Sequence, residues 1–230
     1  MTLTQTKFQY PQCLNSFAII ASMADTKLTK DEKQTLNSYN KYGRAWARAH
    51  MDYDSWKKEL RRFKDYLPKG KVLEVGSGGG RDTKKLIELG YEYLGTDVSE
   101  GLLKAAQENN SGAKFMLKSV YDLDFPNNTF DGFWACAVLL HIPKSRIDEA
   151  LKELHKVTKP KGVGFISVKK GRGERFIIEP PPDGKRLFSF YSLKGFEKRL
   201  LNNGFEILHS EERKKTAKTT WLVYFVRPLK

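Results

Sequence analysis

The chain has 230 residues, of which 40% are hydrophobic and 30% charged, as in an ordinary soluble globular protein. A chain of this length can bury a sizeable core within one domain. Its two cysteines, Cys13 and Cys136, lack the spacing of a metal or redox motif. This cysteine usage excludes a disulfide-built scaffold and favours a cytoplasmic setting. No metal site is predicted.

The net charge of +14 is distributed along the whole chain, without a long block of like charges. Charge spread in this way favours a solvated basic surface over a nucleic-acid partner, because net charge speaks to solubility and non-specific attraction. An RNA partner stays open as the alternative interpretation. The same positive charge would assist the binding of an anionic small molecule.

Residues 1–28 read as a poorly defined extension with a short apolar run at 17–23. That run is too short to span a membrane. Three interpretations stay open for it: the core of a signal peptide, an extension upstream of a start at Met23, or a helix packed on the body. After the extension we predict a helical region at 29–70 and an α/β domain at 71–230.

The helical region is predicted to hold two helices, the first of which carries an aromatic face. Tyr39, Tyr42, Trp46 and His50 recur at helical spacing and therefore share that face. Either the face packs on the sheet, or the helix covers a ligand cleft as a lid with Tyr39 or Tyr42 towards the ligand. A lid would serve to exclude water.

The 71–83 segment is predicted to be a strand, a glycine turn and a helix, which together make half of a nucleotide-binding unit. Its pattern is acidic-x-Gly-x-Gly-x-Gly, at Glu74, Gly76, Gly78 and Gly80. A dinucleotide fingerprint needs glycine at the sixth position, where Arg81 stands, and the Gly-Lys-Ser/Thr ending of a phosphate loop is absent. Glycines here allow unusual backbone angles and a close approach of a ligand to the main chain.

A second strand is predicted at 91–96, and it ends in Asp97. An acidic side chain at the tip of the second strand can accept hydrogen bonds from both ribose hydroxyls of a nucleotide. The alternative is that Asp97 caps the next helix, although Ser99 can fill that role equally well.

The fourth strand is predicted at 130–138 and is almost continuously apolar, as a strand covered on both faces should be. His141 follows its carboxyl end, which is where ligands of open α/β sheets bind. A neutral imidazole there could take a proton from a substrate near pH 7. The alternative is a purely structural histidine.

The C-terminal part is predicted to add a helix at 144–157, a fifth strand at 163–168 and a closing pair of strands at 205–208 and 219–226. The short link in that pair requires antiparallel pairing. Between them lie a polar loop with Arg172 and Arg175, a stiff turn at 180–184, and a β-like segment ending in Tyr191. The five strand–helix alternations predict a Rossmann-like, doubly wound α/β sheet.

Taken in order, these motifs resemble class I S-adenosylmethionine (SAM) methyltransferases, in particular the methyltransferase type 11 and tellurite-resistance-methyltransferase-like proteins. The residues that carry the resemblance lie at 73–83, 95–99, 130–143, 154–162, 165–171 and 204–206, with Trp221. The resemblance implies a mostly parallel seven-stranded sheet with a C-terminal antiparallel hairpin. It implies SAM as cofactor and S-adenosylhomocysteine (SAH) as product.

The resemblance also implies roles for individual residues. Those expected to bind SAM are Glu74, Gly76, Ser77, Gly78, Gly80, Asp97, Val98, Ser119, Val120 and Ala135. Ser119 falls where the family usually places an acidic group that accepts from the adenine amine, which is a departure from its pattern. The residues expected at the acceptor or on the lid are Tyr39, Tyr42, Arg172, Arg175 and Tyr191, with His141 as the catalytic candidate.

The implied reaction is in-line transfer of the SAM methyl group to a small-molecule nucleophile. A general base is required only if that nucleophile arrives protonated; an anion needs none, and His141, Arg172 and Arg175 would then orient it. Two alternatives stay open, an RNA (tRNA) methyltransferase and a non-catalytic SAM-binding protein. The motifs leave the methyl acceptor unnamed.

Overall fold

The computed structural model describes residues 28–179 and 184–230. The interpretations offered for the N-terminal extension at 1–27 and the predicted turn at 180–183 lie outside the described residues. Within the described ranges, no helix is both long and apolar enough to cross a bilayer.

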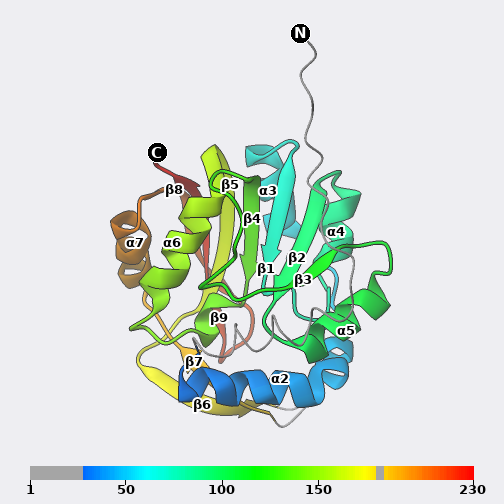
Figure 1. The fold of residues 1–230 in the computed structure, drawn as a ribbon. Helices are drawn as coiled ribbons and strands as arrows, with labels where there is room; N and C mark the ends of the chain where they lie inside the picture. The colour runs from blue at the N-terminus through cyan, green and yellow to red at the C-terminus, as the bar shows by residue number, and fades with distance from the viewer. Residues whose placement is uncertain (1–27, 180–183) are drawn as a thin grey trace.

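One mixed sheet forms the centre of the molecule, with the strand order β3-β2-β1-β4-β5-β9-β8 (Figure 1). The sheet has seven strands, and only the pairs that involve β9 are antiparallel. Its strands are β1 Lys71–Val75, β2 Glu92–Asp97, β3 Phe115–Leu117, β4 Phe130–Cys136, β5 Thr158–Lys169, β8 Phe205–Lys214 and β9 Thr220–Pro228. The predicted doubly wound sheet with its closing hairpin is confirmed.

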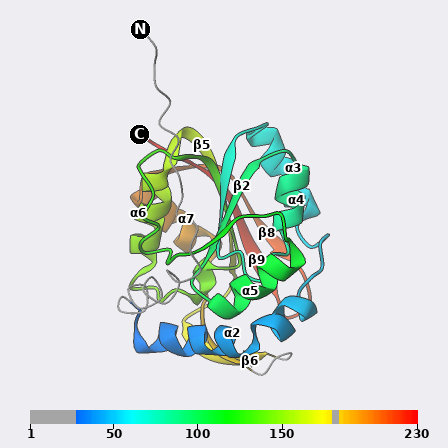
Figure 2. The ribbon, with the colours of Figure 1, turned by 45° about the vertical axis from the view of Figure 1, so that its right-hand side comes forward.

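Helices cover both faces of this sheet (Figure 2). Helices α6 and α7 pack on one face, and α3 and α4 pack on the other. The helices are α2 Lys30–Ala49, α3 Lys57–Tyr66, α4 Thr83–Glu88, α5 Glu100–Asn109, α6 Ile147–Val157 and α7 Leu193–Asn202. Because both faces are covered, strands such as β4 bury side chains in both directions.

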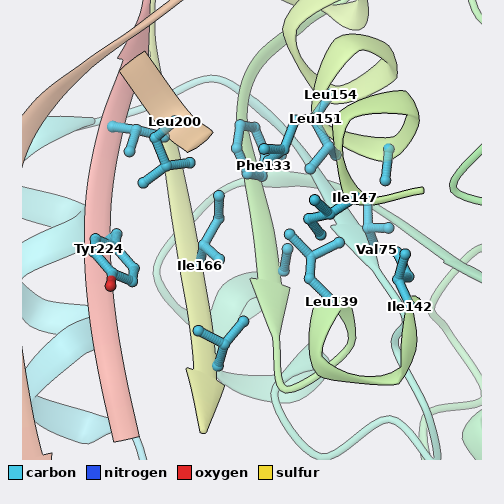
Figure 3. Packing of buried hydrophobic residues seen from close by; sticks show 14 of the residues in the cluster. Val75, Phe133, Leu139, Ile142, Ile147, Leu151, Leu154, Ile166, Leu200 and Tyr224 are labelled. Atoms are coloured by element: carbon cyan, nitrogen blue, oxygen red, sulfur yellow. The ribbon is translucent and has the colours of Figure 1, made fainter. Parts of the chain in front are cut away.

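The core is divided by the sheet into two apolar layers. On the side of α6 and α7, Ile147, Leu151 and Leu154 of α6 lie over Phe133 of β4 (Figure 3). On the opposite side, Trp134 stacks on Phe165 with ring centroids 3.7 Å apart. Adjacent residues of β4 thus face opposite layers, as the alternation of a strand requires. These layers fix the strands whose carboxyl ends carry the site.

Helix α2 runs along the carboxyl edge of the parallel strands, beside a small second sheet (Figure 1). That sheet pairs β6 Glu174–Glu179 with β7 Gly184–Ser189 in antiparallel register. A capping box between Thr29 and Glu32 starts α2. The prediction for 171–175 was a polar loop, whereas Glu174 and Arg175 already belong to β6. The sequence alone does not show that these residues form a strand, because their pairing with β7 depends on the tertiary fold.

Three contacts hold α2 against the rest of the domain, two of them close approaches of small residues and the third a hydrogen bond. Gly43 of α2 meets Gly101 of α5 so closely that a Cβ on Gly43 would lie 2.5 Å from the Gly101 backbone. Ala47 meets Gly79 in the same way, at 2.3 Å. On the other side, the Thr35 hydroxyl accepts from the backbone N–H of Leu187 in β7 at 2.9 Å. Helix α2 is therefore a roof joined both to the glycine turn and to the β6–β7 hairpin.

Candidate active site

A cavity of about 260 Å³ lies under this roof, at the carboxyl edge of the parallel strands. Its walls come from the turn after β1, the ends of β2 and β4, helix α2, the end of β5 and strand β7. The wall residues that carry the argument below are Tyr39, Trp46, Glu74, Gly76, Ser77, Gly78, Gly79, Arg81, Asp82, Asp97, Val98, Ser119, Val120, His141, Lys169, Arg186 and Phe188. We call the part around Gly76–Gly79 and Asp97 the cofactor end. The part around Tyr39, His141, Lys169, Arg186 and Phe188 is the acceptor end.

The glycine turn is shaped by left-handed backbone angles and by close neighbours. Gly76 and Gly78 have φ values of +67° and +56°, which side chains disfavour. A Cβ on Gly76 would lie 2.3 Å from the Val138 side chain, and one on Gly78 would lie 3.3 Å from the Trp46 ring. Glycine is thus required at both positions, and the turn leaves its main chain open to the cavity.

Asp97 lies at the tip of β2 and fastens the turn. One carboxylate oxygen accepts from the Gly78 N–H at 2.9 Å, and the other accepts from the Ser99 N–H at 2.9 Å. Burial raises the pKa of Asp97 above its usual range, while these amide hydrogen bonds oppose the rise. A carboxylate can accept about four hydrogen bonds, so Asp97 keeps room for a further donor such as a ribose hydroxyl. Ser99 caps α5, so Asp97 is not needed as the cap, and its role towards a ribose stays a prediction.

Glu74 is buried at the end of β1, where the Thr83 and Tyr93 hydroxyls donate to one of its oxygens. Burial raises the pKa of Glu74 to about 8, and the nearby Asp82 carboxylate adds to the rise, while the two hydroxyls oppose it. The acidic residue that opens the glycine motif therefore carries a proton through much of the neutral range and reaches the cavity as a hydrogen-bonding group.

Beside the turn lies an ion pair that the sequence analysis did not assign to the site. Arg81 donates from Nε and Nη2 to the Asp82 carboxylate at 2.6 and 2.7 Å, and Trp134 donates to the same carboxylate at 2.9 Å. Burial alone would raise the pKa of Asp82, but the Arg81 guanidinium outweighs it and holds the pKa below its usual value. Both residues fall within the 73–83 motif, but adjacent residues of opposite charge rarely indicate a buried pair.

Ser119 and Val120 follow β3 and line the cavity, and their place beside the adenine stays a prediction. Ser119 is buried, and its hydroxyl accepts from the Tyr121 N–H at 3.3 Å in a tight turn. The Tyr121 hydroxyl donates to Glu32 near the start of α2, and Glu32 also accepts from Arg146 at 2.9 Å. This turn is thereby connected to the roof.

His141 lies in the short 3₁₀ segment Leu139–His141 after β4, at the acceptor end. Its Nδ1 is 2.6 Å from the Leu187 carbonyl oxygen, and its Nε2 is 2.8 Å from the Tyr39 hydroxyl. Burial lowers the pKa of His141 to about 3; the Leu187 carbonyl opposes this shift, and the charges of Arg186 and Lys169 add to it. The ring is therefore neutral at physiological pH.

These contacts determine where the protons lie. A carbonyl oxygen can only accept, so Nδ1 of His141 carries the proton and Nε2 accepts from the Tyr39 hydroxyl. Arg186 Nη1 donates to the Tyr39 oxygen at 3.1 Å. The result is a directed chain from Arg186 through Tyr39 and His141 to Leu187. The chain links β7, α2 and the 3₁₀ segment across the cavity.

Two cationic side chains flank the Phe188 ring at the acceptor end. The Lys169 ammonium lies 4.3 Å from the ring centroid, and the Arg186 guanidinium lies 5.4 Å from it. Arg186 is only 5% exposed although it carries a permanent charge. Neither residue was among the predicted site residues, because Lys169 reads as the end of a strand and Arg186 as part of a β-like segment.

Some of the predicted site residues do not line the cavity. Gly80 turns towards α5, where Asn110 donates to its carbonyl at 3.0 Å, and Ala135 is buried in the core layer beneath α6. Tyr42 sits on the roof beside Gly184. The remaining three lie around the base of the β6–β7 hairpin: exposed Arg172, exposed Arg175, which stacks on Phe190 at 3.9 Å, and Tyr191, buried against Phe196.

The cavity also holds polar atoms suited to a ligand. Within the described ranges, the buried Ser77 hydroxyl and the buried Trp46 indole N–H have no hydrogen-bond partner, and both residues line the cofactor end. Buried polar groups are nearly always satisfied, so such atoms indicate a missing partner. Together with the open lone pairs of Asp97 and the exposed main chain of the turn, they fit a nucleoside that carries an amino-acid chain.

Comparison with known proteins shows which family this part of the chain is similar to. Residues 73–166 match the family model described as a methyltransferase domain. The chain is 31% identical to YqeM of Bacillus subtilis over 126 residues, which are 52% of this chain and 50% of YqeM. It is 28% identical to the demethylmenaquinone methyltransferase of Corynebacterium urealyticum over 145 residues, which are 61% of this chain and 61% of that protein. The chain thus spans between half and about three fifths of the length of these relatives.

Among solved structures, the fold is similar to that of the Burkholderia thailandensis 1,6-didemethyltoxoflavin-N1-methyltransferase. The TM-score is 0.72 at 20% identity, and the match covers 88% of this chain and 92% of the other. That enzyme was crystallised with 1,6-didemethyltoxoflavin and SAH. At this level of identity the likeness concerns the fold.

Proposed function

We propose that this protein transfers a methyl group from SAM to a small-molecule nucleophile, because residues 73–166 match the family model of a methyltransferase domain that the motifs predicted. One observation carries the proposal: a single cavity joins the glycine turn and Asp97 to a second group of polar side chains under the same roof. A methyl donor and a methyl acceptor can therefore lie side by side in the cavity that α2 covers.

The cofactor end supplies the binding groups. Asp97 would accept from the ribose hydroxyls, the main chain of Gly76–Gly79 would line the amino-acid chain, and the turn containing Ser119 and Val120 would border the adenine. Ser77 and Trp46 would satisfy their buried polar atoms on the ligand. When bound, SAM supplies an electrophilic methyl group, which forms a bond to the acceptor's lone pair as its bond to sulfur breaks and the electron pair stays on sulfur.

The protein's own contribution is to orient the acceptor and exclude water. Holding two reactants in line at near-attack distance can supply roughly 7–11 kcal/mol of the barrier reduction. Helix α2 and the hairpin close over the cavity through the Thr35–Leu187 and Tyr39–His141 hydrogen bonds. An enclosed site of this kind strengthens every electrostatic contact inside it.

His141 acts in this proposal as a positioning residue. Its Nε2 is occupied by the Tyr39 hydroxyl, and its pKa of about 3 leaves it too weak a base to hold a substrate proton near neutral pH. It instead fixes the Tyr39 hydroxyl at the acceptor end. We therefore propose that His141 orients Tyr39 rather than accepting a substrate proton, the role considered from the sequence.

The test is calorimetry with SAM and SAH, followed by a labelled-methyl transfer screen over thiols, metalloid oxyanions, carboxylic acids and tRNA. We expect SAH to bind, and label to appear on a small molecule. Failure of the wild-type protein to bind either SAM or SAH would end the proposal. Label on tRNA with steep salt dependence would instead support the RNA alternative suggested by the +14 net charge. A cytoplasmic location, where SAM is made, is expected from the same proposal.

A further inference from the structure

We propose that Arg81 binds the carboxylate of the cofactor's amino-acid chain, together with the Ser77 hydroxyl and the Trp46 indole N–H. This inference rests on the proposed function and names the groups that would distinguish SAM from a nucleoside without an acid. It gives a role to Arg81, which occupies the position where a dinucleotide fingerprint would have its last glycine.

The geometry of Arg81 provides the first argument. Arg81 follows the glycine turn directly and lines the cavity beside it. Asp82 holds its side chain by accepting from Nε at 2.6 Å and from Nη2 at 2.7 Å, and Nη2 also lies 3.2 Å from the Cys136 sulfur. None of these contacts uses Nη1, which carries two of the five N–H donors of a guanidinium. The buried ion pair therefore fixes a cationic group whose remaining donors can serve a carboxylate in the cavity.

The acidic neighbours of Arg81 are compatible with a second carboxylate. The charge of Asp82 is balanced by the Arg81 guanidinium, and its oxygens are occupied by Arg81 and by the Trp134 N–H. Burial raises the pKa of Glu74 to about 8, and the Asp82 carboxylate adds to the rise, so Glu74 is uncharged through much of the neutral range. Lys215, which is exposed in the loop between β8 and β9, adds a positive charge to the cavity wall. This part of the wall therefore carries no net negative charge that would repel an acid.

Ser77 provides the second argument, because its backbone is satisfied and its side chain is not. Its N–H donates to the Thr96 carbonyl at 2.9 Å, and its own carbonyl accepts from the Gly80 N–H at 3.0 Å. Ser77 is 5% exposed, and within residues 28–179 and 184–230 its hydroxyl has no hydrogen-bond partner. Buried hydroxyls nearly always have one. Because Ser77 lines the cavity, a carboxylate oxygen bound there could accept this hydrogen.

Trp46 brings a further donor from the roof. Its ring stacks on His50 with centroids 4.2 Å apart and meets the Tyr39 ring edge-on at 5.5 Å, so the indole is held in one orientation. The same ring lies 3.3 Å from the position of a Cβ on Gly78, which places it against the glycine turn. Its buried N–H has no hydrogen-bond partner in the part of the chain that the structure describes. A ligand in the cavity could supply the acceptor, and a carboxylate is the strongest acceptor that SAM carries.

The three groups share one chemical requirement, which is an acceptor. A guanidinium and an indole can only donate hydrogen bonds, and a carboxylate can accept about four. All three groups lie around one turn, since Ser77 belongs to it, Arg81 follows it and Trp46 packs on Gly78. The acceptor at this end of the cavity is Asp97, which is expected to take the ribose hydroxyls. Donors for an acid and an acceptor for a sugar are thus separated, as an amino acid joined to a nucleoside requires.

The experiment compares SAM with decarboxylated SAM, which lacks only the carboxylate, by calorimetry without a methyl acceptor. We expect the wild type to bind SAM about tenfold or more tightly, as hydrogen bonds to a charged group imply. Arg81→Gln should reduce this preference to about twofold or less, since the cationic donor is lost. Trp46→Phe, which keeps an aromatic ring over the turn, should reduce it by several-fold. The affinity for decarboxylated SAM should stay within about twofold of wild type in Trp46→Phe, because only a donor to the missing acid is removed.

Arg48→Gln is the matched control. It removes an arginine from the exposed face of α2, in the same helix as Trp46 but outside the cavity lining, so the preference for SAM should persist. If Arg81→Gln does not fold because Asp82 loses its partner, Trp46→Phe carries the same test. Equal binding of the two compounds by the wild type, or a preference that survives both substitutions, overturns the inference and leaves the proposed function standing. A wild type that binds neither SAM nor SAH ends the proposed function itself, so the two failures are distinguishable.

Discussion

The two ends of the cavity are built in different ways. At the cofactor end the main contributors are the backbone of Gly76–Gly79 and the Asp97 carboxylate that fastens it, all close together in the sequence. At the acceptor end the contributors are side chains from distant segments. Tyr39 reaches His141 across 102 residues and Arg186 across 147. The cofactor end is thus formed mainly by one local stretch of backbone, whereas the acceptor end is formed by side chains that only the tertiary fold brings together.

This contrast separates what is general from what is specific. A backbone turn beside a strand-tip carboxylate can bind the same nucleoside in any protein that has it, because it contacts the ribose and the chain that every such ligand shares. Side chains gathered on α2 and the β6–β7 hairpin can change without disturbing the sheet. Specificity is thus expected at the acceptor end, in keeping with the rule that functions differ by the sites carried on a common fold.

The largest effect is expected at the cofactor end, from Asp97→Ala. The change removes the acceptor for the Gly78 and Ser99 N–H groups and for the expected ribose hydroxyls. SAH affinity should fall by roughly 1–3 kcal/mol, the usual cost of losing charged hydrogen bonds in a buried site. Calorimetry measures the change. Glu92→Ala, at the exposed opposite end of β2, should leave SAH affinity at the wild-type value, and a loss there as large as for Asp97→Ala would contradict a local effect.

A second prediction concerns the contact that holds the roof to the turn. In Gly79→Val, the new Cβ would lie 2.3 Å from the Ala47 Cβ, which neither backbone can easily relieve. Overpacking of this kind typically costs about 1–3 kcal/mol of unfolding free energy. SAH affinity should fall as well, since α2 would be displaced. Gly112→Val, whose Cβ would meet no atom within 4 Å, is the control for loss of glycine as such. Urea unfolding and calorimetry give the two readings.

The same contrast explains how far the sequence could predict the site. The turn and Asp97 line the cavity, and the sequence could single them out because they follow a simple local pattern of an apolar strand, glycines and an acid at a strand tip. Their contact with a ligand stays a prediction. The doubly wound sheet was predicted from the strand–helix alternation, but the order of its strands was not. Helical spacing put Tyr39 and Tyr42 on one face of α2, but it could not decide between packing on the sheet and a lid, nor separate Tyr39 from Tyr42, which lies outside the lining.

The acceptor end resisted prediction for a physical reason. Which arginine faces the cavity depends on the register of β6 against β7, and that register pairs Arg175 with Phe188 and Ile177 with Arg186. A shift by one residue would reverse the faces. Arg172 and Arg175 were chosen from sequence because they follow the fifth strand directly, whereas the hairpin carries Arg186 back to the same edge. His141 follows the carboxyl end of β4, as the sequence indicated, but its partners on α2 and β7 and the burial that lowers its pKa depend on tertiary packing.

A third prediction sharpens the comparison by testing His141→Ala. Its removal leaves the Tyr39 hydroxyl without its acceptor but does not touch the glycine turn. Turnover of the acceptor identified by the labelled-methyl screen should fall by about tenfold, the scale of one lost hydrogen bond in a positioned group, with SAH affinity unchanged within a few-fold. Single-turnover methyl transfer gives the rate. Undiminished turnover would remove His141 from the site.

The two ends should also differ in their response to pH. The pKa of His141 falls from 6.5 to about 3 on folding, so only the unfolded chain takes up a proton between these values, and stability is lost as pH falls through that window. The pKa of Glu74 rises from 4.5 to about 8, so the folded state keeps its proton longer, and stability is lost as pH rises through that window. The urea midpoint, measured from pH 4 to 9, should therefore depend less on pH at the acid side in His141→Gln. It should depend less on pH at the alkaline side in Glu74→Gln. Unaltered profiles in both variants would contradict these assignments.

The smallest effect is expected from Tyr39→Phe. The ring remains packed against Trp46 at 5.5 Å, so the roof keeps its shape, and only the hydroxyl between Arg186 and His141 is lost. The unfolding free energy should fall by about 0.5–1.5 kcal/mol, the net worth of a typical hydrogen bond. SAH affinity should not change, because the glycine turn and Asp97 are untouched. A loss of SAH affinity in Tyr39→Phe would mean that the hydroxyl also shapes the cofactor end. Urea unfolding with SAH calorimetry on the same sample therefore separates a residue that holds the roof from one that supports cofactor binding.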